Sequence, residues 1–546
     1  MSPSRWATAS SGSTPPTSSP PAGESSSPTP TWTPPGSPAT SPPCSPTARR
    51  WPAWVPPRPA PARATAPTAW PRSSPRPPGA PPRRRGRTVA DRFHLVGIGG
   101  AGMSAVAELL LSRGHAVSGS DQRDSAVLAR LRGLGAQVHV GHDGAHVPAD
   151  AAVVVSTAVR ETNPELAVAR TRGQQVLHRS QALALAAAGL DFVAVAGAHG
   201  KTSTSAMLAV ALREAGEDPS YAIGGTVLAL GTGAHLGQGR AFVAEADESD
   251  GSFLNYAPTV AVVTNIEPDH LDHHGSEAAF RQAFEDFAGR IVPGGLLVAC
   301  ADDPGALALA RHAAAAGIRV RTYGTGPGDL PGHVRMDLTE LGPRGSTAVL
   351  HDDARQEPLE LAVGGAHMLL NAAGAWCAGV ELGVAPDVMA RALGAFTGTG
   401  RRFEEKGAAA GVRVVDDYAH HPTEVAATLR TARLAAAGGR VLALFQPHLY
   451  SRTQNFAGAF AEALALADEV VVTDVYAARE DPLPGVDGSL ITDAMSAAAA
   501  RYVPDRIEAA RALADLARPG DLAMTVGAGD VTELGAVILD RLRERA

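Results

Sequence analysis

The sequence predicts an α/β protein in which three series of strands and helices follow one another. Short runs of Val, Ile, Ala and Leu alternate with longer helix-forming runs, which is typical of parallel, doubly wound sheets. Two of the series contain a glycine-rich turn between a strand and a helix, at 97–104 and at 197–202. A chain of 546 residues is long enough for about three domains. Because ligands of such sheets bind at the carboxyl ends of the strands, we expect the functional residues there.

Residues 1–88 differ in composition from the rest of the chain. They are rich in Pro, Ser, Thr and Ala, and up to position 90 the chain holds 11 Arg, no Lys and a single acid, Glu24. Such a segment cannot bury a core, so we expect disorder. A basic nucleic-acid arm, a targeting peptide and a translation start assigned too early are the alternatives. We favour the last, because the segment lacks the apolar stretch of a secretory signal and its Pro and Trp content disfavours a transit helix.

The rest of the chain is acidic, since the overall net charge of −7 already includes this basic segment. Nothing in it indicates a nucleic-acid partner. No apolar run approaches the length that crosses a bilayer, so we expect a soluble protein that needs no membrane. The cysteines Cys44, Cys300 and Cys377 lie far apart and match no metal or disulfide spacing, which favours a reducing cytoplasm.

The first series begins with a strand at 93–96, followed by GIGGAGMS and a helix. The glycines fit G-x-G-x-x-G, in which missing side chains let a backbone turn approach a diphosphate, although this signal alone is weak. The next strand ends at Asp121, where an acid can accept hydrogen bonds from ribose hydroxyls. A helix N-cap at a solvated strand end explains Asp121 equally well. Another strand, at 153–155, ends in Ser156 and Thr157.

The second series is organised around FVAVAGAHGKTST at 192–204. A strand, a glycine turn and a helix form a phosphate site, because the start of the helix offers unpaired N–H groups. Lys201 adds a mobile charge for the β- and γ-phosphates, and Thr202 supplies a hydroxyl for Mg²⁺. The loop is a shorter G-x-x-G-K-T form of the usual pattern, which would need a glycine at Val195. A surface turn that happens to contain Gly-Lys-Thr is the alternative interpretation.

Two acidic strand ends follow this loop. A strand at 242–244 leads into EADESD, with four carboxylates in six residues, and a strand at 260–264 leads into NIEPDH. Crowded carboxylates repel one another unless a cation lies among them, so we predict a Mg²⁺–nucleotide site. Solvated polar loops are the alternative. Further along, His367 and Asn371 lie one helical turn apart and could contact a base, although a buried, satisfied His explains His367 nearly as well.

The third series begins after TGTGRRF at 397–403, a stretch typical of a hinge. Polar residues again follow its strands, in DDYAHHP, QPH and GAGD, so this unit should present a binding edge. We place the domains at 89–188, 189–397 and 398–546.

Seven motifs together resemble the cytoplasmic Mur ligases of peptidoglycan synthesis over about residues 92–546. They are GIGGAGMS, GAHGKTST, EADESDGSF, TNIEPDHLD, GTGRRF, DDYAHHPTE and FQPHLYSRT. The resemblance implies a UDP-sugar-binding, Rossmann-like N-terminal domain, a central P-loop ATPase domain and a Rossmann-like C-terminal domain that takes the amino acid. Within the family, EADESDGSF favours members that join L-alanine to UDP-N-acetylmuramate over the related murein peptide ligases. The implied reaction is ATP-dependent amide formation through an acyl phosphate.

The resemblance also implies a role for individual residues. Catalytic roles fall to Lys201, Glu245, His270 and Arg452, and Mg²⁺ would be held, directly or through water, by Thr202, Glu245 and His270. ATP would be bound by Gly197, His199, Gly200, Lys201, Thr202, Ser203, His367, Asn371 and Asp417. The UDP-sugar would be bound by Gly99, Gly100, Met103, Ser104, Asp121, Ser156, Thr157 and Ser249. L-Alanine would be received by Tyr418 and Arg452.

Two positions depart from the family pattern. Met368 replaces an expected Asn, which implies fewer or rearranged adenine contacts, and Leu449 replaces an Arg of some relatives, so amino-acid binding must depend more on Arg452. A nicotinamide-dependent oxidoreductase would explain the first glycine turn and Asp121 but leaves Lys201 without a purpose. A non-enzymatic ATP-gated binding module would need no third domain lined with His, Tyr and Arg. The oligomeric state, monomer or homodimer, stays open.

Overall fold

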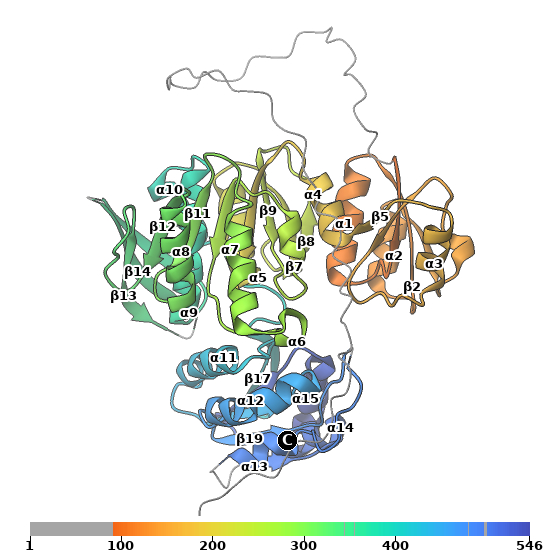
Figure 1. Ribbon diagram of the computed structural model, residues 1–546. Helices are drawn as coiled ribbons and strands as arrows, with labels where there is room; N and C mark the ends of the chain where they lie inside the picture. Colours follow the sequence, from red (N-terminus) through yellow and green to blue (C-terminus); the bar gives the residue numbers. More distant parts are fainter. Residues whose placement is uncertain (1–90, 343, 354, 479, 496–499) are drawn as a thin grey trace, which may run out of the picture. The chain divides into compact units, whose positions relative to one another are not determined.

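The computed structural model describes residues 91–342, 344–353, 355–478, 480–495 and 500–546. The segment expected to be disordered, 1–88, lies outside them. The described residues form three sheets flanked by helices (Figure 1). Each sheet falls within one of the three proposed domain ranges, whose boundaries at 188 and 397 stay a prediction.

The first sheet is parallel, with strand order β3-β2-β1-β4-β5. Its strands are β1 (Arg92–Val96), β2 (Ala116–Asp121), β3 (Gln137–Val140), β4 (Ala152–Val155) and β5 (Val176–His178). Its helices are α1 (Ala101–Ser112), α2 (Ala126–Gly133), α3 (Pro164–Thr171) and α4 (Arg179–Ala186), with a 3₁₀ turn at Gly144–His146. The strand order reverses between β1 and β4, and in open α/β sheets ligands bind at this switch point.

The central sheet has ten strands in the order β15-β14-β13-β12-β11-β10-β6-β9-β7-β8. They are β6 (Asp191–Ala196), β7 (Ser220–Val227), β8 (Thr232–His235), β9 (Ala241–Glu245), β10 (Val260–Val263), β11 (Leu296–Cys300), β12 (Arg319–Gly324), β13 (Val334–Leu341), β14 (Ser346–Asp352) and β15 (Arg355–Leu361). The helices are α5 (Lys201–Glu214), α6 (Leu271–His274), α7 (Glu277–Ala288), α8 (Pro304–Ala315), α9 (Ala366–Glu381) and α10 (Pro386–Leu393), with a 3₁₀ turn at Ser252–Asn255.

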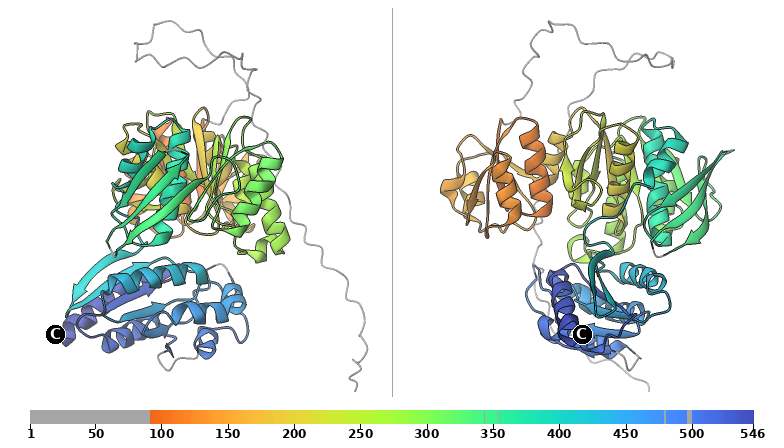
Figure 2. Two further views of the ribbon diagram at one scale, coloured as in Figure 1. Left: turned by 90° about the vertical axis from the view of Figure 1, so that its left-hand side faces the viewer. Right: turned by 180° about the vertical axis from the view of Figure 1, so that it is seen from behind.

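Alternating side chains on the central strands build two separate cores. Val193 and Val195 of β6 pack with α5, α9 and α10, whereas Ala194 and Ala196 face the side covered by α7 and α8. The left view of Figure 2 shows the green and teal helices on opposite sides of this sheet. Because β6 is buried on both faces, its carboxyl end and the loop that follows have a rigid support.

The third sheet has strand order β16-β17-β21-β18-β19-β20. Its strands are β16 (Glu404–Ala409), β17 (Val412–Asp417), β18 (Val441–Phe445), β19 (Glu469–Val472), β20 (Ala500–Tyr502) and β21 (Leu522–Val526). Its helices are α11 (Pro422–Ala435), α12 (Tyr450–Leu464), α13 (Ser489–Ala494), α14 (Arg506–Leu516) and α15 (Leu534–Arg545), with a 3₁₀ turn at Asp530–Glu533. All pairs are parallel except β16–β17, so the loops after β17, β18 and β21 meet at one edge.

The structure differs from the expected parallel pattern at the ends of the central sheet. Strands β13, β14 and β15 form an antiparallel meander, and β7 and β8 form a hairpin. The sequence of residues 291–361 indicates strands and turns, but the structure also places the helix α8 in this stretch. Its start carries a helix signal in the sequence, because Asp303 caps the helix by accepting from the N–H of Ala306 and Pro304 occupies the first turn.

No helix among the residues that the structure describes is both long and apolar enough to cross a membrane.

Candidate active site

The loop after β6 is held open by glycine and tied to the end of β10. Gly197 has φ +133° and Gly200 has φ +83°, conformations that disfavour any side chain. The N–H of His199 donates to Asn265 Oδ1 at 2.9 Å, and Asn265 Nδ2 donates back to the His199 carbonyl at 2.9 Å. Thr264 Oγ1 donates to the same carbonyl at 2.5 Å. These hydrogen bonds hold the loop against the end of β10, and the N-terminus of α5 that follows it offers N–H groups to an anion.

Lys201 is engaged inside this loop. Its Nζ donates to the Gly197 carbonyl at 2.7 Å and to Glu248 Oε1 at 2.8 Å. Burial by itself lowers the pKa of Lys201, but the carboxylates of Glu248 and Asp247 outweigh burial and raise it. Lys201 is therefore a fixed positive charge next to the N-terminus of α5, which suits the terminal phosphates of a nucleotide.

The acidic loop after β9 surrounds this lysine. Burial raises the pKa of Glu248 to about 7, although Lys201 opposes that shift. Asp247 forms an ion pair with Arg179 at the start of α4. Burial alone would hinder ionisation of Asp247, but the charges of Arg179 and Lys201 hold its pKa well below the usual range. The acids predicted to need a cation are thus partly neutralised by basic side chains.

The predicted magnesium ligands lie around one cavity. Thr202, Glu245 and His270 all line a cavity of about 660 Å³. Burial lowers the pKa of His270 to about 4, so its ring is neutral. Its Nδ1 is buried and, among the described residues, has no hydrogen-bond partner. The hydroxyl of Thr202 and the carboxylate of Glu245 are oxygen ligands that fit a magnesium ion with further water ligands, and the neutral ring of His270 could accept a hydrogen bond from one of those waters.

The same cavity is lined from all three domains. The first domain contributes Gly102 of α1 and Arg179 of α4, and the third contributes Tyr418, His448 and Arg452. The residues predicted for the phosphates, the metal and the amino acid therefore share one space, which is large enough for a small-molecule site.

Arg452, predicted to receive an amino-acid carboxylate, contacts a carboxylate of the protein itself. Its Nη2 donates to both oxygens of Asp269, at 3.0 Å each, and both side chains are buried. Its Nη1 lies 3.3 Å from His448 Nδ1. Asp269 lies next to His270, so this contact connects α12 to the predicted metal ligand. A substrate carboxylate at Arg452 would have to share or replace Asp269.

Tyr418, the other residue predicted for the amino acid, lies under two cations. The guanidinium carbons of Arg401 and Arg402 lie 4.8 and 5.1 Å from its ring centroid. Such cation–π contacts fix the ring at the edge of the cavity.

A second, smaller cavity of about 180 Å³ collects the residues predicted for the nucleoside. His367, Asn371 and Asp417 line it, together with Met368 and with three residues of the phosphate loop that were predicted to bind ATP, His199, Gly200 and Ser203. Burial lowers the pKa of His367 to about 4, so a base would meet a neutral ring. Both carboxylate oxygens of Asp417 accept backbone N–H groups, from Phe403 and Ala419, at 2.8 Å. The imidazole of His199 pairs with Glu267 through Nε2 and with Glu424 through Nδ1.

The residues of the first domain that were predicted to bind the UDP-sugar have different surroundings from one another. Asp121 Oδ2 accepts the N–H of Gly99 at 2.9 Å and so closes the glycine turn. Met103 is buried in the core, and Ser104 bonds to the carbonyl of Ala101. Thr157 donates to Asp250 of the acidic loop at 2.9 Å. The assignment of Gly99, Gly100, Met103, Ser104, Asp121, Ser156 and Thr157 to a UDP-sugar stays a prediction; Ser249 lines the large cavity.

Several residues that build the site carried no assignment from sequence. Arg179 holds the acidic loop through Asp247, and Asn265 holds the phosphate loop through His199. Asp269 holds the side chain of Arg452. Each lies at or just after a strand's carboxyl end, a position that could have revealed it. The sequence could not indicate their partners.

Three family models match the chain. The model described as "Mur ligase family, catalytic domain" matches residues 92–190, "Mur ligase middle domain" matches 195–379, and "Mur ligase, glutamate ligase domain" matches 401–529. The chain belongs to the Mur ligase family, and the predicted architecture of three α/β domains is confirmed.

The two relatives compared in sequence below bear the same name. The chain is 59% identical to UDP-N-acetylmuramate–L-alanine ligase from Kineococcus radiotolerans, over 83% of this chain and 97% of the relative. It is 55% identical to the same-named protein from Renibacterium salmoninarum, over 83% and 96%. Among solved structures, UDP-N-acetylmuramate–alanine ligase from Thermotoga maritima superposes with a TM-score of 0.69 at 29% identity, covering 83% of this chain and all of that one. A murein peptide ligase from Psychrobacter arcticus gives 0.62 at 25% identity, over 83% and 98%.

The phosphate loop should not tolerate a side chain at Gly197. A Cβ there would lie 2.2 Å from Thr264 Oγ1, so Gly197→Ala must distort the loop. We expect nucleotide affinity to fall at least about tenfold, or about 1.4 kcal/mol, by calorimetry.

Gly216→Ala is the matched control. Gly216 also has positive φ, +86°, but a Cβ there meets nothing within 4 Å. The variant Gly216→Ala should lower the free energy of unfolding by about 1–2 kcal/mol and leave nucleotide affinity unchanged. Equal nucleotide binding by the two variants would contradict the role of the loop.

Proposed function

We propose that this chain is an ATP-dependent ligase that joins L-alanine to the lactyl carboxylate of UDP-N-acetylmuramate in peptidoglycan precursor synthesis. The observation that carries the proposal is the single cavity in which Lys201 and the acidic strand ends face Arg452. Relatives that are 50–59% identical and bear that activity in their names support it. The proposed cytoplasmic location rests on the family resemblance and on the spacing of the cysteines.

The first step is transfer of the γ-phosphate of ATP to the lactyl carboxylate, which forms an acyl phosphate and releases ADP. Lys201 and the N–H groups at the start of α5 hold the phosphates in line with the attacking oxygen. Thr202, Glu245 and His270 would hold Mg²⁺, which, when bound, neutralises charge on the phosphates. The adenosine would occupy the smaller cavity, beside His367 and Asn371.

The second step is attack of the L-alanine amine on the acyl carbon, followed by loss of phosphate from the tetrahedral intermediate. Arg452 places the amino acid by pairing with its carboxylate, and the ring of Tyr418 bounds the pocket. The positive charge of Lys201 remains beside the departing phosphate. Positioning and charge neutralisation therefore account for both steps.

A murein peptide ligase is the alternative within the family, and the fold does not separate the two, since both kinds of protein superpose on the chain. The high sequence identity to relatives named UDP-N-acetylmuramate–L-alanine ligase favours the ligase that uses L-alanine. The nicotinamide-dependent oxidoreductase receives no support from the cavity, where the predicted phosphate and metal residues meet.

A product assay tests the proposed function. The full chain is incubated with UDP-N-acetylmuramate, ATP and Mg²⁺ and with either a panel of single amino acids or the tripeptide that a murein peptide ligase would accept. We expect the L-alanine adduct and ADP, with ATP consumed only when an acceptor amine is present. Product from the tripeptide but not from L-alanine would favour the alternative.

The proposed metal ligand Glu245 gives a prediction about Mg²⁺. Its Oε1 accepts the Gly224 N–H at 2.6 Å, so Glu245→Gln keeps the volume and removes the charge. The Mg²⁺ concentration for half-maximal rate should rise several-fold, because a carboxylate is a better ligand than an amide. Glu214→Gln, at the end of α5, is the control. An unchanged Mg²⁺ curve for Glu245→Gln would remove this residue from the metal site.

The proposed amino-acid residue Arg452 gives a prediction about the second step. Arg452→Ala should raise the apparent KM for L-alanine about a hundredfold, since losing one partner of a buried charge pair costs about 2–5 kcal/mol. The KM for UDP-N-acetylmuramate should stay near normal, and acyl phosphate should still be trapped by hydroxylamine.

Asp269→Asn separates this role from a purely structural one. It removes the ion pair but keeps the guanidinium, which is then free for a substrate carboxylate. The KM for L-alanine should therefore stay the same or fall. If Asp269→Asn and Arg452→Ala raise this KM equally, Arg452 acts through Asp269 and the assignment of the amino-acid pocket is wrong.

A further inference from the structure

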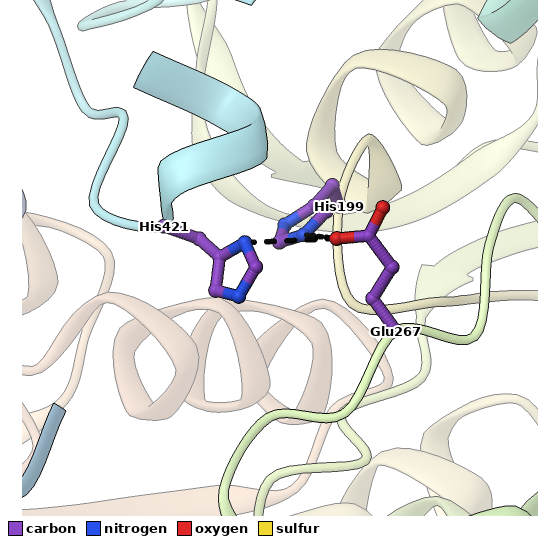
Figure 3. A group of neighbouring side chains, drawn as sticks. All are labelled: His199, Glu267 and His421. Carbon is purple, nitrogen blue, oxygen red and sulfur yellow. Dashed lines mark hydrogen bonds and ion pairs between the residues drawn. The ribbon is translucent and has the colours of Figure 1, made fainter. Parts of the chain in front are cut away.

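A cluster of metal-binding side chains lies outside the magnesium residues. His199, Glu267 and His421 each place one ligand atom within 4.8 Å of the other two (Figure 3). His199 belongs to the phosphate loop, Glu267 follows β10, and His421 is the residue before α11. The cluster therefore connects the central domain to the first helix of the third domain.

We propose that His199, Glu267 and His421 form a binding site for a divalent cation of the zinc type. The site would use Nε2 of His199, Oε2 of Glu267 and Nδ1 of His421, with water in the fourth position. This site is distinct from the magnesium ligands and goes beyond the proposed function.

Two of the three ligand pairs lie near the separation that one small ion requires, and the two histidine nitrogens lie within 4.8 Å of each other. Glu267 Oε2 lies 3.2 Å from His199 Nε2 and 3.7 Å from His421 Nδ1. Two ligands of a tetrahedral zinc ion at its usual bond lengths are about 3.3 Å apart, so only small shifts are needed. Two imidazoles and one carboxylate favour zinc and its neighbours over magnesium, which prefers oxygen ligands.

His421 supplies an independent indication. Its ring is buried, and neither nitrogen has a hydrogen-bond partner among the described residues. A buried, unpartnered polar group costs free energy, which a bound cation would recover.

The surroundings orient the other two ligands. Nδ1 of His199 faces Glu424 Oε1 at 3.3 Å, which leaves Nε2 for the ion in the carboxylate–histidine–metal arrangement of many metal sites. Thr423 Oγ1 donates to Glu267 Oε2 at 2.7 Å. Although burial opposes a charge there, hydrogen bonds to Glu267 and Glu424 raise the pKa of His199 to about 9. The metal would displace the Nε2 proton to solvent, so it takes the place of that positive charge.

The test is metal binding by the full chain after removal of metals with a chelator. Zn²⁺ is titrated by calorimetry with millimolar Mg²⁺ present to occupy the magnesium ligands, and Co²⁺ is titrated in parallel for the visible bands of tetrahedral cobalt. We expect the tightest equivalent of Zn²⁺ and the cobalt bands to be lost in His421→Gln and in Glu267→Gln. Melting curves without metal identify a variant that fails to fold, and the other variant then carries the test.

Two control variants keep the outcome specific. His235→Gln removes an exposed histidine that pairs with Asp218, and should bind Zn²⁺ like the unmodified chain. His142→Gln changes the group of histidines around Glu165 in the first domain. Equal binding by His421→Gln and the unmodified chain, or loss of the equivalent in His142→Gln instead, would overturn the proposal.

Discussion

The buried charges around Lys201 constrain the rest of the site. Lys201 pairs with Glu248, and Arg179 pairs with Asp247 of the same loop. Removing ions from water costs several kcal/mol each unless they are paired, so the acidic loop, the phosphate loop and the start of α4 must keep their mutual positions. A nucleotide brings further negative charge to this group, next to Glu245 and Asp247. This excess of negative charge is the physical reason for proposing Mg²⁺ at this edge of the sheet.

Much of this arrangement could be predicted because the carboxyl ends of neighbouring parallel strands lie at the same edge of the sheet. Strands β9, β6 and β10 are neighbours, so the acidic loop, the phosphate loop and the residues after β10 meet at one edge. Short sequence patterns locate each strand end, and the topology of an α/β sheet brings them together. The helix α8 and the antiparallel meander were not predicted. Strands were expected in this part of the chain, but the alternation of buried and partly exposed residues in β14 indicates only a strand and not the direction of its neighbours.

Pairings between distant charges could not be predicted in the same way. Arg452 and Asp269 are separated by 183 positions, and the sequence offers Arg452 many possible carboxylates. Only the packing of α12 against the loop after β10 selects one of them. The backbone of Leu449 could not be predicted either. Leu449 lies just before α12 and has a φ of +68°, which is unusual for a leucine. Such strain costs about 1–2 kcal/mol and depends on the surrounding structure, which no local pattern reveals.

Contacts between the central and third domains connect a residue proposed to bind the amino acid with residues proposed to bind the metal and the phosphates. Asp269 accepts from Arg452, and its Oδ1 also accepts the N–H of His270 at 2.8 Å. His270 itself has φ +52°, a conformation that this hydrogen bond helps to hold. A substrate carboxylate that took over Arg452 would release Asp269 and loosen the backbone that positions the candidate metal ligand. One aspartate therefore connects the proposed amino-acid pocket to the proposed metal site.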